Sequence, residues 1–245
     1  MQLSPAVIAA IQADAIQRYP EESCGVITAA GYVPLRNCHP TPLTAFDCDA
    51  ECAALTMAGE VLGLVHSHPD GPEAPSSHDI ASQRAMDIPW GLLMTDGEAV
   101  SQPYFWGDSL EPPPLLGRPF RHGPSGTDGK GDCGALIRDY FRIEHGLLIP
   151  DFARQDKWWM TPGVDLYGQH FAAAGFVKAD QDNPKPGDVA LLQVRVPDSN
   201  PVANHGGIFL GNHLMLHHLE GRLSRTEPVL GWSKMVRGWL RHAAL

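Results

Sequence analysis

Two histidines one residue apart, His66 and His68, follow an apolar run at residues 61–65. Alternate residues of an extended segment share a face, so both imidazoles are expected to point the same way. Catalytic zinc sites use three protein ligands and leave one position for water, and Asp79, one loop later, could supply the third ligand. Glu22 is the best candidate for a general base. The pattern therefore indicates a zinc-dependent hydrolytic site.

Each of these residues also has an ordinary structural interpretation. A single His-x-His pattern is more often a chance pair of surface histidines than a metal site. The run Ser76-Ser77-His78-Asp79 fits a capping box, in which Ser76 caps a helix and Asp79 reaches back to the cap. Glu21 and Glu22 could be solvated charges at a helix end. Only the combination of residues favours the metal site.

The combination has the spacing of a known motif. Over about residues 1–107 it resembles the JAMM motif of the JAB/MPN metallopeptidases, through Glu22 before Cys24-Gly25, Phe46-x-x-Asp49, His66-Ser67-His68-Pro69, Ser76 and Asp79. The resemblance implies a cytidine-deaminase-like α/β sandwich. Members of this family cleave isopeptide bonds or peptide tails of ubiquitin-like proteins.

The same resemblance implies roles for the site residues. His66, His68 and Asp79 would bind one zinc ion. Glu22 would act as the general base, and Ser76 would help to stabilise the oxyanion. Because no residue of the motif is substituted, a metal-competent site is expected.

A second candidate site is centred on Cys133, expected at the N-terminus of a helix, with Gly134 helping to keep the approach to its sulfur open. The partial positive charge of a helix N-terminus lowers the pKa of a thiol and favours the nucleophilic thiolate. The nucleophile also needs a base and a group that orients the base. His205 and His217 could fill these roles if a turn near Gly211-Asn212 folds their strands into a hairpin.

A structural alternative exists for this site too. A single cysteine is most often a small buried hydrophobe. His217 and His218 are adjacent, so one of the two rings is expected to face away from the site. On these positions alone, both interpretations remain open.

The blocks around these residues are more specific. Over about residues 115–245 they look like the three signature blocks of the NlpC/P60 peptidases, in the family order, at residues 132–136, 186–189 and 205–211. The resemblance implies a papain-like α+β half-barrel with Cys133 as nucleophile, His205 as base and His217 as the orienting residue. One departure is Phe120, which stands where the family often has a tyrosine.

Composition limits the class of protein. The net charge is 18 − 28 = −10 with neutral histidines, and no block of lysine or arginine stands out, which argues against a nucleic-acid binder. Five cysteines without a CxxC pair suit a reducing compartment. Residues 1–18 have the periodicity of an amphipathic helix and not the composition of a signal peptide. No run approaches the ~20 apolar residues of a membrane span.

The elements that must position these residues fall into two predicted domains. Three consecutive prolines at 112–114 mark a short, stiff linker, residues 108–116. In the first domain, residues 1–107, helical and strand-like segments interleave, so an α/β fold is expected. Its expected helices lie at 1–18, 49–59 and 77–86, and its apolar or strand-like segments lie at 25–28, 61–65 and 90–94.

The second domain, residues 117–245, has a different order of elements. Helical patterns at about 133–145 and 164–174 precede strand-like runs at 189–196, 206–210 and 214–218. This order predicts an α+β fold with an antiparallel sheet. The tail at 237–242 fits either a helix or a strand. Trp158-Trp159, Trp232 and Trp239 could form a sugar-stacking surface, although such aromatic residues more often belong to a core.

The order of the two domains resembles the tail-assembly protein K family of lambda-like phages. The resemblance implies a peptidase at the phage tail tip that processes a tail protein or cuts peptidoglycan stem peptides, with tail tip proteins as partners. It also implies a location in the host cytoplasm during assembly and then in the virion tail. The alternatives are a bacterial cell-wall endopeptidase and a structural tail component with inactive sites.

Overall fold

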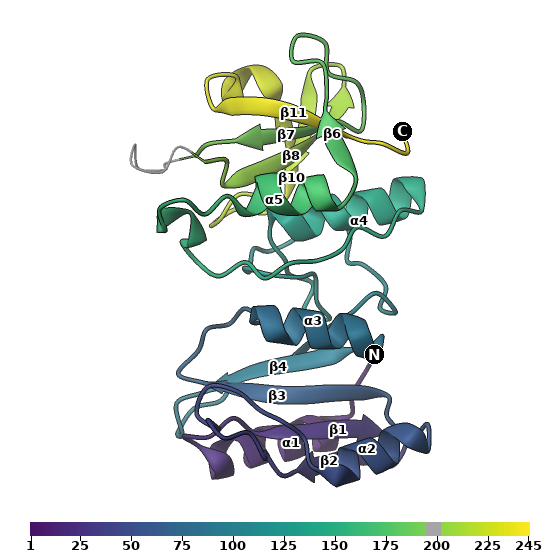
Figure 1. The fold of residues 1–245 in the computed structure, drawn as a ribbon, viewed down its shortest axis with the longest axis vertical. Coiled ribbons are helices and arrows are strands. Elements are labelled where there is room, and N and C mark those ends of the chain that lie inside the picture. The colour runs from purple at the N-terminus through teal and green to yellow at the C-terminus, as the bar shows by residue number, and fades with distance from the viewer. Residues whose placement is uncertain (195–201) are drawn as a thin grey trace. The chain divides into compact units, whose positions relative to one another are not determined.

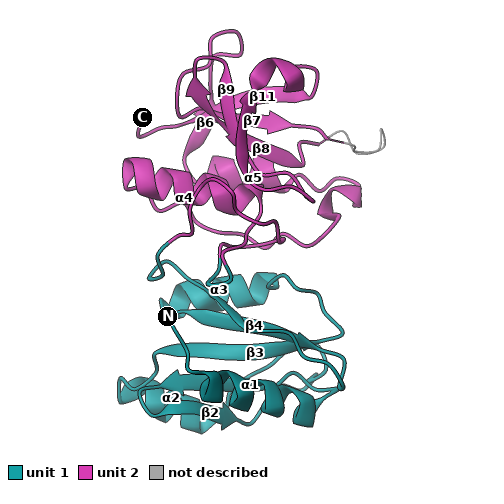
Figure 2. Cartoon of the chain, turned by 180° about the vertical axis from the view of Figure 1, so that it is seen from behind, with its two compact units in different colours: residues 1–111, 126–128 teal, residues 112–125, 129–245 magenta. Residues whose placement is uncertain are grey.

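The chain forms two compact units in a computed structural model that describes residues 1–194 and 202–245 (Figure 1). Unit 1 comprises Met1–Glu111 together with Gly126–Asp128, and unit 2 comprises Pro112–Ser125 together with Gly129–Leu245 (Figure 2). Within the described ranges, no helix is long and apolar enough to cross a membrane.

Unit 1 is built around a five-stranded mixed sheet with the order β2-β1-β3-β4-β5. Strands β3 and β4 are parallel, and the other neighbouring strands are antiparallel. The α/β fold expected from the sequence is therefore confirmed. The elements are α1 (Pro5–Arg18), β1 (Cys24–Thr28), β2 (Gly31–Leu35), α2 (Ala50–Met57), β3 (Gly63–Pro69), α3 (Ser77–Met86), β4 (Trp90–Thr95) and β5 (Tyr104–Trp106).

Helices cover both faces of this sheet (Figure 1). Helix α1 starts at Pro5, and the side chain of its cap residue Ser4 accepts a hydrogen bond from the backbone of Val7. Its buried residues pack in one cluster with one residue from each of four strands: Ile11, Ala15, Ile27, Val65, Leu93 and Phe105. The intervening residues of β3, including both histidines, therefore face the opposite side, where α3 lies.

Two features of unit 1 differ from the sequence-based expectation. The strand expected at residues 61–65 begins at Gly63 and continues through the histidines to Pro69, because parallel pairing with β4 extends from Leu64–Trp90 to Pro69–Thr95. Strands β2 and β5 were not expected. Both lie at edges of the sheet: β2 is mostly half-buried, which leaves a weak apolar pattern, and β5 is buried but only three residues long.

Unit 2 contains a six-stranded sheet with the order β10-β9-β8-β7-β11-β6, in which every described strand pair is antiparallel. This arrangement confirms the α+β prediction. The elements are α4 (Cys133–His145), η1 (Trp158–Met160), α5 (Leu166–Ala173), β6 (Phe176–Lys178), β7 (Val189–Leu192), β8 (His205–Gly211), β9 (Leu214–His217), β10 (Arg225–Pro228), η2 (Val229–Trp232) and β11 (Val236–His242).

Helices α4 and α5 pack on one face of this sheet (Figure 1). Buried Leu136, Ile137 and Phe141 of α4 join Val189 and Ile208 of the sheet in one apolar cluster. A second cluster on the opposite face contains Ala190, Leu192, Phe209, Met215 and Trp239, so Trp239 belongs to the core.

The structure gives the end of one predicted strand and the type of the C-terminal segment. The strand expected at 189–196 ends at Leu192, and residues 195 and 196 lie outside the described residues. The tail at 237–242 is part of β11, which pairs with β7 and β6.

The predicted linker, residues 108–116, has neither helix nor strand. Its proline run is nevertheless fixed to unit 2, because the Arg118 guanidinium donates hydrogen bonds to the carbonyl oxygens of Pro113 (2.7 Å) and Pro114 (3.2 Å). The segment Gly126–Asp128, which lies inside the predicted second domain, belongs to unit 1. There Thr127 exchanges two hydrogen bonds with the backbone of Phe105, at 2.9 and 3.0 Å.

The core of unit 2 makes a stability prediction. Leu136 is fully buried against the sheet, so Leu136→Ala is expected to lower the free energy of unfolding by roughly 2–5 kcal/mol through lost burial and a residual cavity. The measurement is urea denaturation of the full chain, with hydrogen exchange to locate the loss in unit 2. Ile143→Ala on the same helix is the control, because Ile143 is 49% exposed. Equal losses in the two variants would contradict the packing described here.

Two candidate catalytic sites

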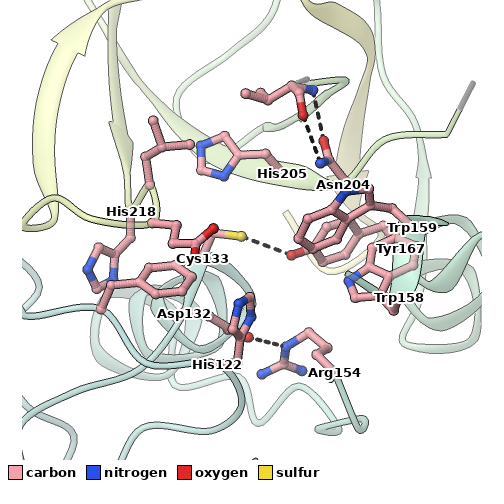
Figure 3. Close-up of a pocket in the computed structure, with 14 residues that line it drawn as sticks. His122, Asp132, Cys133, Arg154, Trp158, Trp159, Tyr167, Asn204, His205 and His218 are labelled. Carbon is pink, nitrogen blue, oxygen red and sulfur yellow. Dashed lines mark hydrogen bonds and ion pairs between the residues drawn. The ribbon is translucent and has the colours of Figure 1, made fainter. Parts of the chain in front are cut away.

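Cys133 is the first residue of α4 and lines a cavity of about 150 Å³ in unit 2 (Figure 3). His205, at the start of β8, lines the same cavity. The Sγ atom of Cys133 is 2.9 Å from the Oη atom of Tyr167, a buried residue of α5. The predicted nucleophile and base are therefore brought together.

The hairpin predicted from the sequence forms between β8 and β9. Residues Asn212 and His213 have positive φ angles of 50° and 60°, which suits a tight two-residue hairpin turn. The hairpin places Nε2 of His205 3.0 Å from Nδ1 of His217. Nε2 of His217 in turn lies 3.2 Å from Oε2 of Glu227.

Burial makes the cysteine site electrically neutral. Burial, and secondarily the Asp132 carboxylate, raise the pKa of Cys133 to about 11. Burial also lowers the pKa of His205 to about 3, and His217 and His218 contribute in the same direction. At neutral pH the pair is therefore a thiol and an uncharged imidazole. The sequence-based expectation that Cys133 is a thiolate is therefore wrong for the free protein.

Besides burial, a carboxylate at the N-terminus of α4 opposes ionisation of the thiol. Asp132 is the N-cap of α4, and it accepts hydrogen bonds from the backbone of Ala135 (2.8 Å) and Gly123 (2.9 Å). Its negative charge offsets the positive end of the helix. Arg154, which is buried, holds this carboxylate through Nε at 2.7 Å.

Gly134 has a different role from the one expected. A Cβ atom added there would lie 2.9 Å from Nε of Arg154. The glycine thus admits the guanidinium to the start of α4, where it reaches Asp132.

Sequence reasoning missed several residues of this site. Tyr167 supplies a hydroxyl beside the sulfur, whereas Phe120, at the position where the family often has a tyrosine, lines the cavity wall. His218, expected to face away, also lines the cavity, and it lies two residues after Leu216, which packs in the same cluster as Cys133. No spacing in the sequence connects these residues, since they meet only through tertiary packing.

The tryptophans divide between the site and the core. Trp158 and Trp159 line the cavity of Cys133. Trp232 packs against the His217 ring, with centroids 4.7 Å apart, and its Nε1 donates to Oε2 of Glu227 at 2.9 Å. Trp239 is therefore a core residue, and a sugar-stacking role of the other three tryptophans stays a prediction.

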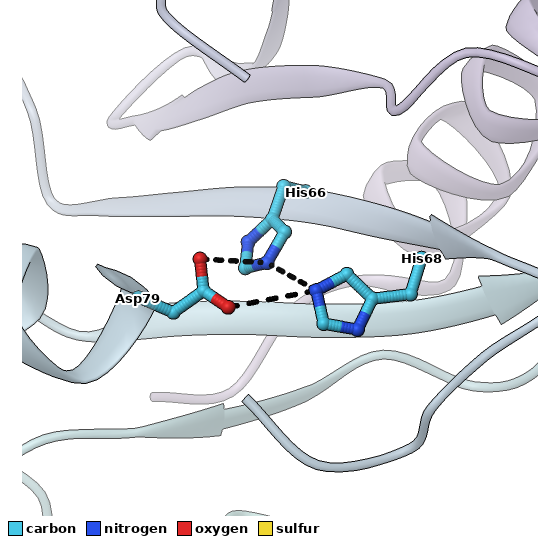
Figure 4. Close-up of side chains that lie close together, drawn as sticks. All are labelled: His66, His68 and Asp79. Carbon is cyan, nitrogen blue, oxygen red and sulfur yellow. Dashed lines mark hydrogen bonds and ion pairs between the residues drawn. The ribbon is translucent and has the colours of Figure 1, made fainter. Parts of the chain in front are cut away.

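The second group of predicted residues converges in unit 1, between β3 and α3 (Figure 4). His66 and His68 face the same side of β3, with their Nε2 atoms 3.2 Å apart. Asp79 of α3 places Oδ1 3.4 Å from Nε2 of His66 and Oδ2 3.5 Å from Nε2 of His68. All three side chains are buried.

These separations fit a tetrahedral metal ion. With ligand distances of ~2.0–2.1 Å, as zinc prefers, neighbouring ligand atoms of a tetrahedron lie about 3.3 Å apart. The Nε2 atoms of His66 and His68 are 3.2 Å apart, and Oδ1 of Asp79 lies 3.4 Å from Nε2 of His66, so both separations are close to that value. Nδ1 of His68 is 2.8 Å from the carbonyl oxygen of Pro72, which accepts its proton and leaves Nε2 free to bind a metal.

The capping interpretation and the metal interpretation of Ser76 and Asp79 hold together. Ser76 is the N-cap of α3, and its Oγ accepts from the backbone of Asp79 at 3.2 Å. The backbone of Ser76 donates to Oδ2 of Asp79 at 2.7 Å. The capping box thus orients the carboxylate toward the histidines. Phe46 stacks on His66, with ring centroids 4.6 Å apart, and fixes the other side of that ring.

Burial and neighbouring charges tune this site. Burial raises the pKa of Asp79, but His66 and His68 outweigh it and hold that pKa well below the usual range. Burial lowers the pKa of His66. Glu22 is buried at the end of the segment before β1, and burial raises its pKa to about 7. A carboxyl group with such a pKa can both accept and release a proton near neutral pH.

Comparison with known families gives one match for each unit. Residues 4–106 match the prokaryotic homologs of the JAB domain, and residues 117–241 match the NlpC/P60 family.

Two relatives match most of the chain, and both are tail tip assembly proteins of phages. The chain is 35% identical over 234 residues to the tail tip assembly protein K of Escherichia phage N15, covering 92% of this chain and 89% of that protein. It is 33% identical over 191 residues to the tail tip assembly protein K of Escherichia phage lambda, covering 77% of this chain and 85% of that protein. A shorter match, 41% identical over 71 residues, covers 26% of this chain and 47% of a probable TtuB-protein conjugate cleaving protease of Thermus thermophilus. The chain thus belongs to the phage tail tip assembly protein K family, with an N-terminal JAB domain and a C-terminal NlpC/P60 domain.

Proposed function

We propose that the chain is a double peptidase of the phage tail tip, with a zinc site in the domain at 1–107 and a cysteine site in the domain at 117–245. The observation that carries the proposal is convergence. In each unit, residues far apart in sequence bring together a set of groups sufficient for amide hydrolysis. A structural tail component with decayed sites would have no reason to keep both sets.

At the metal site, His66, His68 and Asp79 would hold the ion. A zinc ion bound there would polarise the substrate carbonyl and activate a water molecule. Glu22, whose pKa lies near 7, accepts the proton of the attacking water and returns it to the leaving amine. Ser76 uses its oxygen lone pair for the cap and keeps its hydroxyl proton for the oxyanion.

The substrate of the metal site is proposed to be an isopeptide-type amide. The partial match to a probable TtuB-protein conjugate cleaving protease supports this class. A tail protein is the natural source of such a bond in a tail assembly protein.

At the cysteine site, attack begins from the neutral pair. As Sγ of Cys133 bonds to the substrate carbonyl carbon, its proton passes to His205, which then protonates the leaving amine. Water hydrolyses the resulting thioester and regenerates the thiol. His217 orients His205, and the Tyr167 hydroxyl donates to the sulfur as negative charge develops there. The proposed substrates are peptidoglycan stem peptides, with a tail protein as the second possibility.

The setting of this activity follows from the relatives. Their names support tail tip proteins as partners, and assembly in the host cytoplasm followed by residence in the virion tail as the location. An endopeptidase of the bacterial cell wall that is independent of a tail is the less favoured alternative, because both long matches are tail tip assembly proteins.

The metal site makes a stoichiometric prediction. The purified chain is expected to contain one zinc ion, measured by plasma mass spectrometry, and His68→Ala is expected to lose most of it because one of three ligands is removed. His78→Ala is the matched control, since His78 is exposed on α3 beside Asp79. Full zinc retention in His68→Ala would rule out this ligand set.

The two sites predict separate sensitivities. Cys133→Ala is expected to reduce cleavage of stem-peptide fragments below detection, while a zinc chelator leaves that cleavage unchanged, as followed by chromatography of the products. Cys38→Ser is the control, because Cys38 is exposed and lies in unit 1. Loss of stem-peptide cleavage with chelator alone would assign this substrate to the metal site instead.

The raised thiol pKa predicts slow alkylation of the free protein. A pKa of about 11, against an ordinary 9.0, means less thiolate at any pH below both values, so Cys133 should react with iodoacetamide roughly 100-fold more slowly than a free cysteine at pH 8. The rate should rise about tenfold per pH unit from 7 to 9, as measured by mass spectrometry of the Cys133 peptide. A plateau below pH 9 would show a thiolate and contradict the neutral pair.

A further inference from the structure

A carboxylate lies next to His217, the residue predicted to orient the base His205. Glu227 of β10 places Oε2 3.2 Å from Nε2 of His217 and 2.9 Å from Nε1 of Trp232. Its other oxygen, Oε1, pairs with the guanidinium of Arg225, and Arg222 lies 4.0 Å away. Glu227 is thus held from four sides within unit 2, by groups on β9, β10, η2 and the loop before β10.

The donors around this carboxylate fix its role as an acceptor. An indole N–H only donates, and a guanidinium only donates. Both oxygens of Glu227 therefore accept, and the side chain stays ionised. Burial raises the pKa of Glu227, but the hydrogen bonds from Trp232 and His217 and the charge of Arg225 outweigh it and keep that pKa below its usual range.

An ionised Glu227 determines where each histidine proton lies. His217 must donate from Nε2 to the carboxylate, so its Nδ1 carries a lone pair. That lone pair accepts from Nε2 of His205, 3.0 Å away, and this places the His205 proton on Nε2. The remaining nitrogen of His205, Nδ1, is then unprotonated and free to accept the proton of Cys133.

We infer that Glu227 is a positioning residue of the cysteine site, which fixes the tautomers of His217 and, through it, of His205. The inference rests on the proposed cysteine peptidase activity. It adds one carboxylate to the group formed by Cys133, His205 and His217. The ability of His205 to accept a proton then depends on a residue that contacts neither the sulfur nor the substrate.

A glutamine in place of Glu227 would reverse the direction of the hydrogen bonds that link this position to His217 and His205. If its amide nitrogen faces His217, it donates, so His217 accepts at Nε2 and donates from Nδ1 to Nε2 of His205. The His205 proton then moves to Nδ1, where the ring can no longer accept from the thiol. If the amide is turned instead, its NH₂ group meets the guanidinium of Arg225. Both orientations weaken the arrangement that Glu227 supports.

The decisive experiment measures the tautomers directly. In ¹⁵N-labelled full-length wild-type protein, long-range ¹H–¹⁵N spectra are expected to show His205 and His217 both protonated at Nε2, assigned with single His→Gln variants. In Glu227→Gln, at least one of the two rings, His205 or His217, is expected to shift toward protonation at Nδ1. Wild-type rings protonated at Nδ1 would overturn the inference, and this result needs neither a folded Glu227 variant nor any peptidase activity.

Kinetics gives the second readout. Glu227→Gln is expected to lower kcat for stem-peptide cleavage on the order of 10²-fold with little change in KM, because general-base catalysis is impaired and the cavity is not altered. Glu227→Asp should recover part of kcat, since it keeps the charge. Glu144→Gln, exposed on α4, is the matched control. Unchanged kcat and unchanged tautomers in Glu227→Gln would refute the inference, whereas an inactive wild type with the expected tautomers would refute only the proposed function.

Discussion

A carboxylate at the N-terminus of a helix organises each of the two sites. Asp79 completes the capping box of α3 and faces His66 and His68, and Asp132 caps α4 beside Cys133. In both places, backbone N–H groups that a helix leaves unpaired satisfy a buried negative charge. A carboxylate at the start of a helix can therefore also help to position a reactive group against the facing sheet. The same local chemistry thus serves a metal site in one unit and a thiol site in the other.

The two sites differ in how they manage burial. In unit 1 the histidines favour the charge of Asp79, and a metal ion would complete the neutralisation of the buried groups. In unit 2 the charges of Asp132 and Arg154 cancel each other, and the reactive pair stays uncharged. Keeping the thiol protonated at rest limits its oxidation and side reactions, because the thiolate is the reactive form. In the mechanism proposed above, the proton would leave the sulfur as the bond to the substrate carbonyl carbon forms.

Sequence reasoning predicted the parts of the sites that depend on local geometry. His66 and His68 share a face because a strand alternates, Ser76 and Asp79 form a capping box at fixed spacing, and a tight turn pairs His205 with His217. Tyr167 and Glu227 escaped prediction because each reaches its partner through the packing of a separate element. The thiolate was wrongly expected because the helix N-terminus was considered without the desolvation of Cys133 and without the charge of its own cap residue.

The position of Thr127 has a consequence for how the chain acquires its structure. Residues 126–128 complete an edge of the first unit beside β5, although the proline run and the next stretch of chain belong to the second unit. During synthesis, the first sheet therefore cannot gain its final edge contacts until the ribosome has passed Thr127. A fragment that stops at the prolines would carry all three candidate metal ligands but expose the backbone of Phe105, so the two units are interleaved along the chain as they fold.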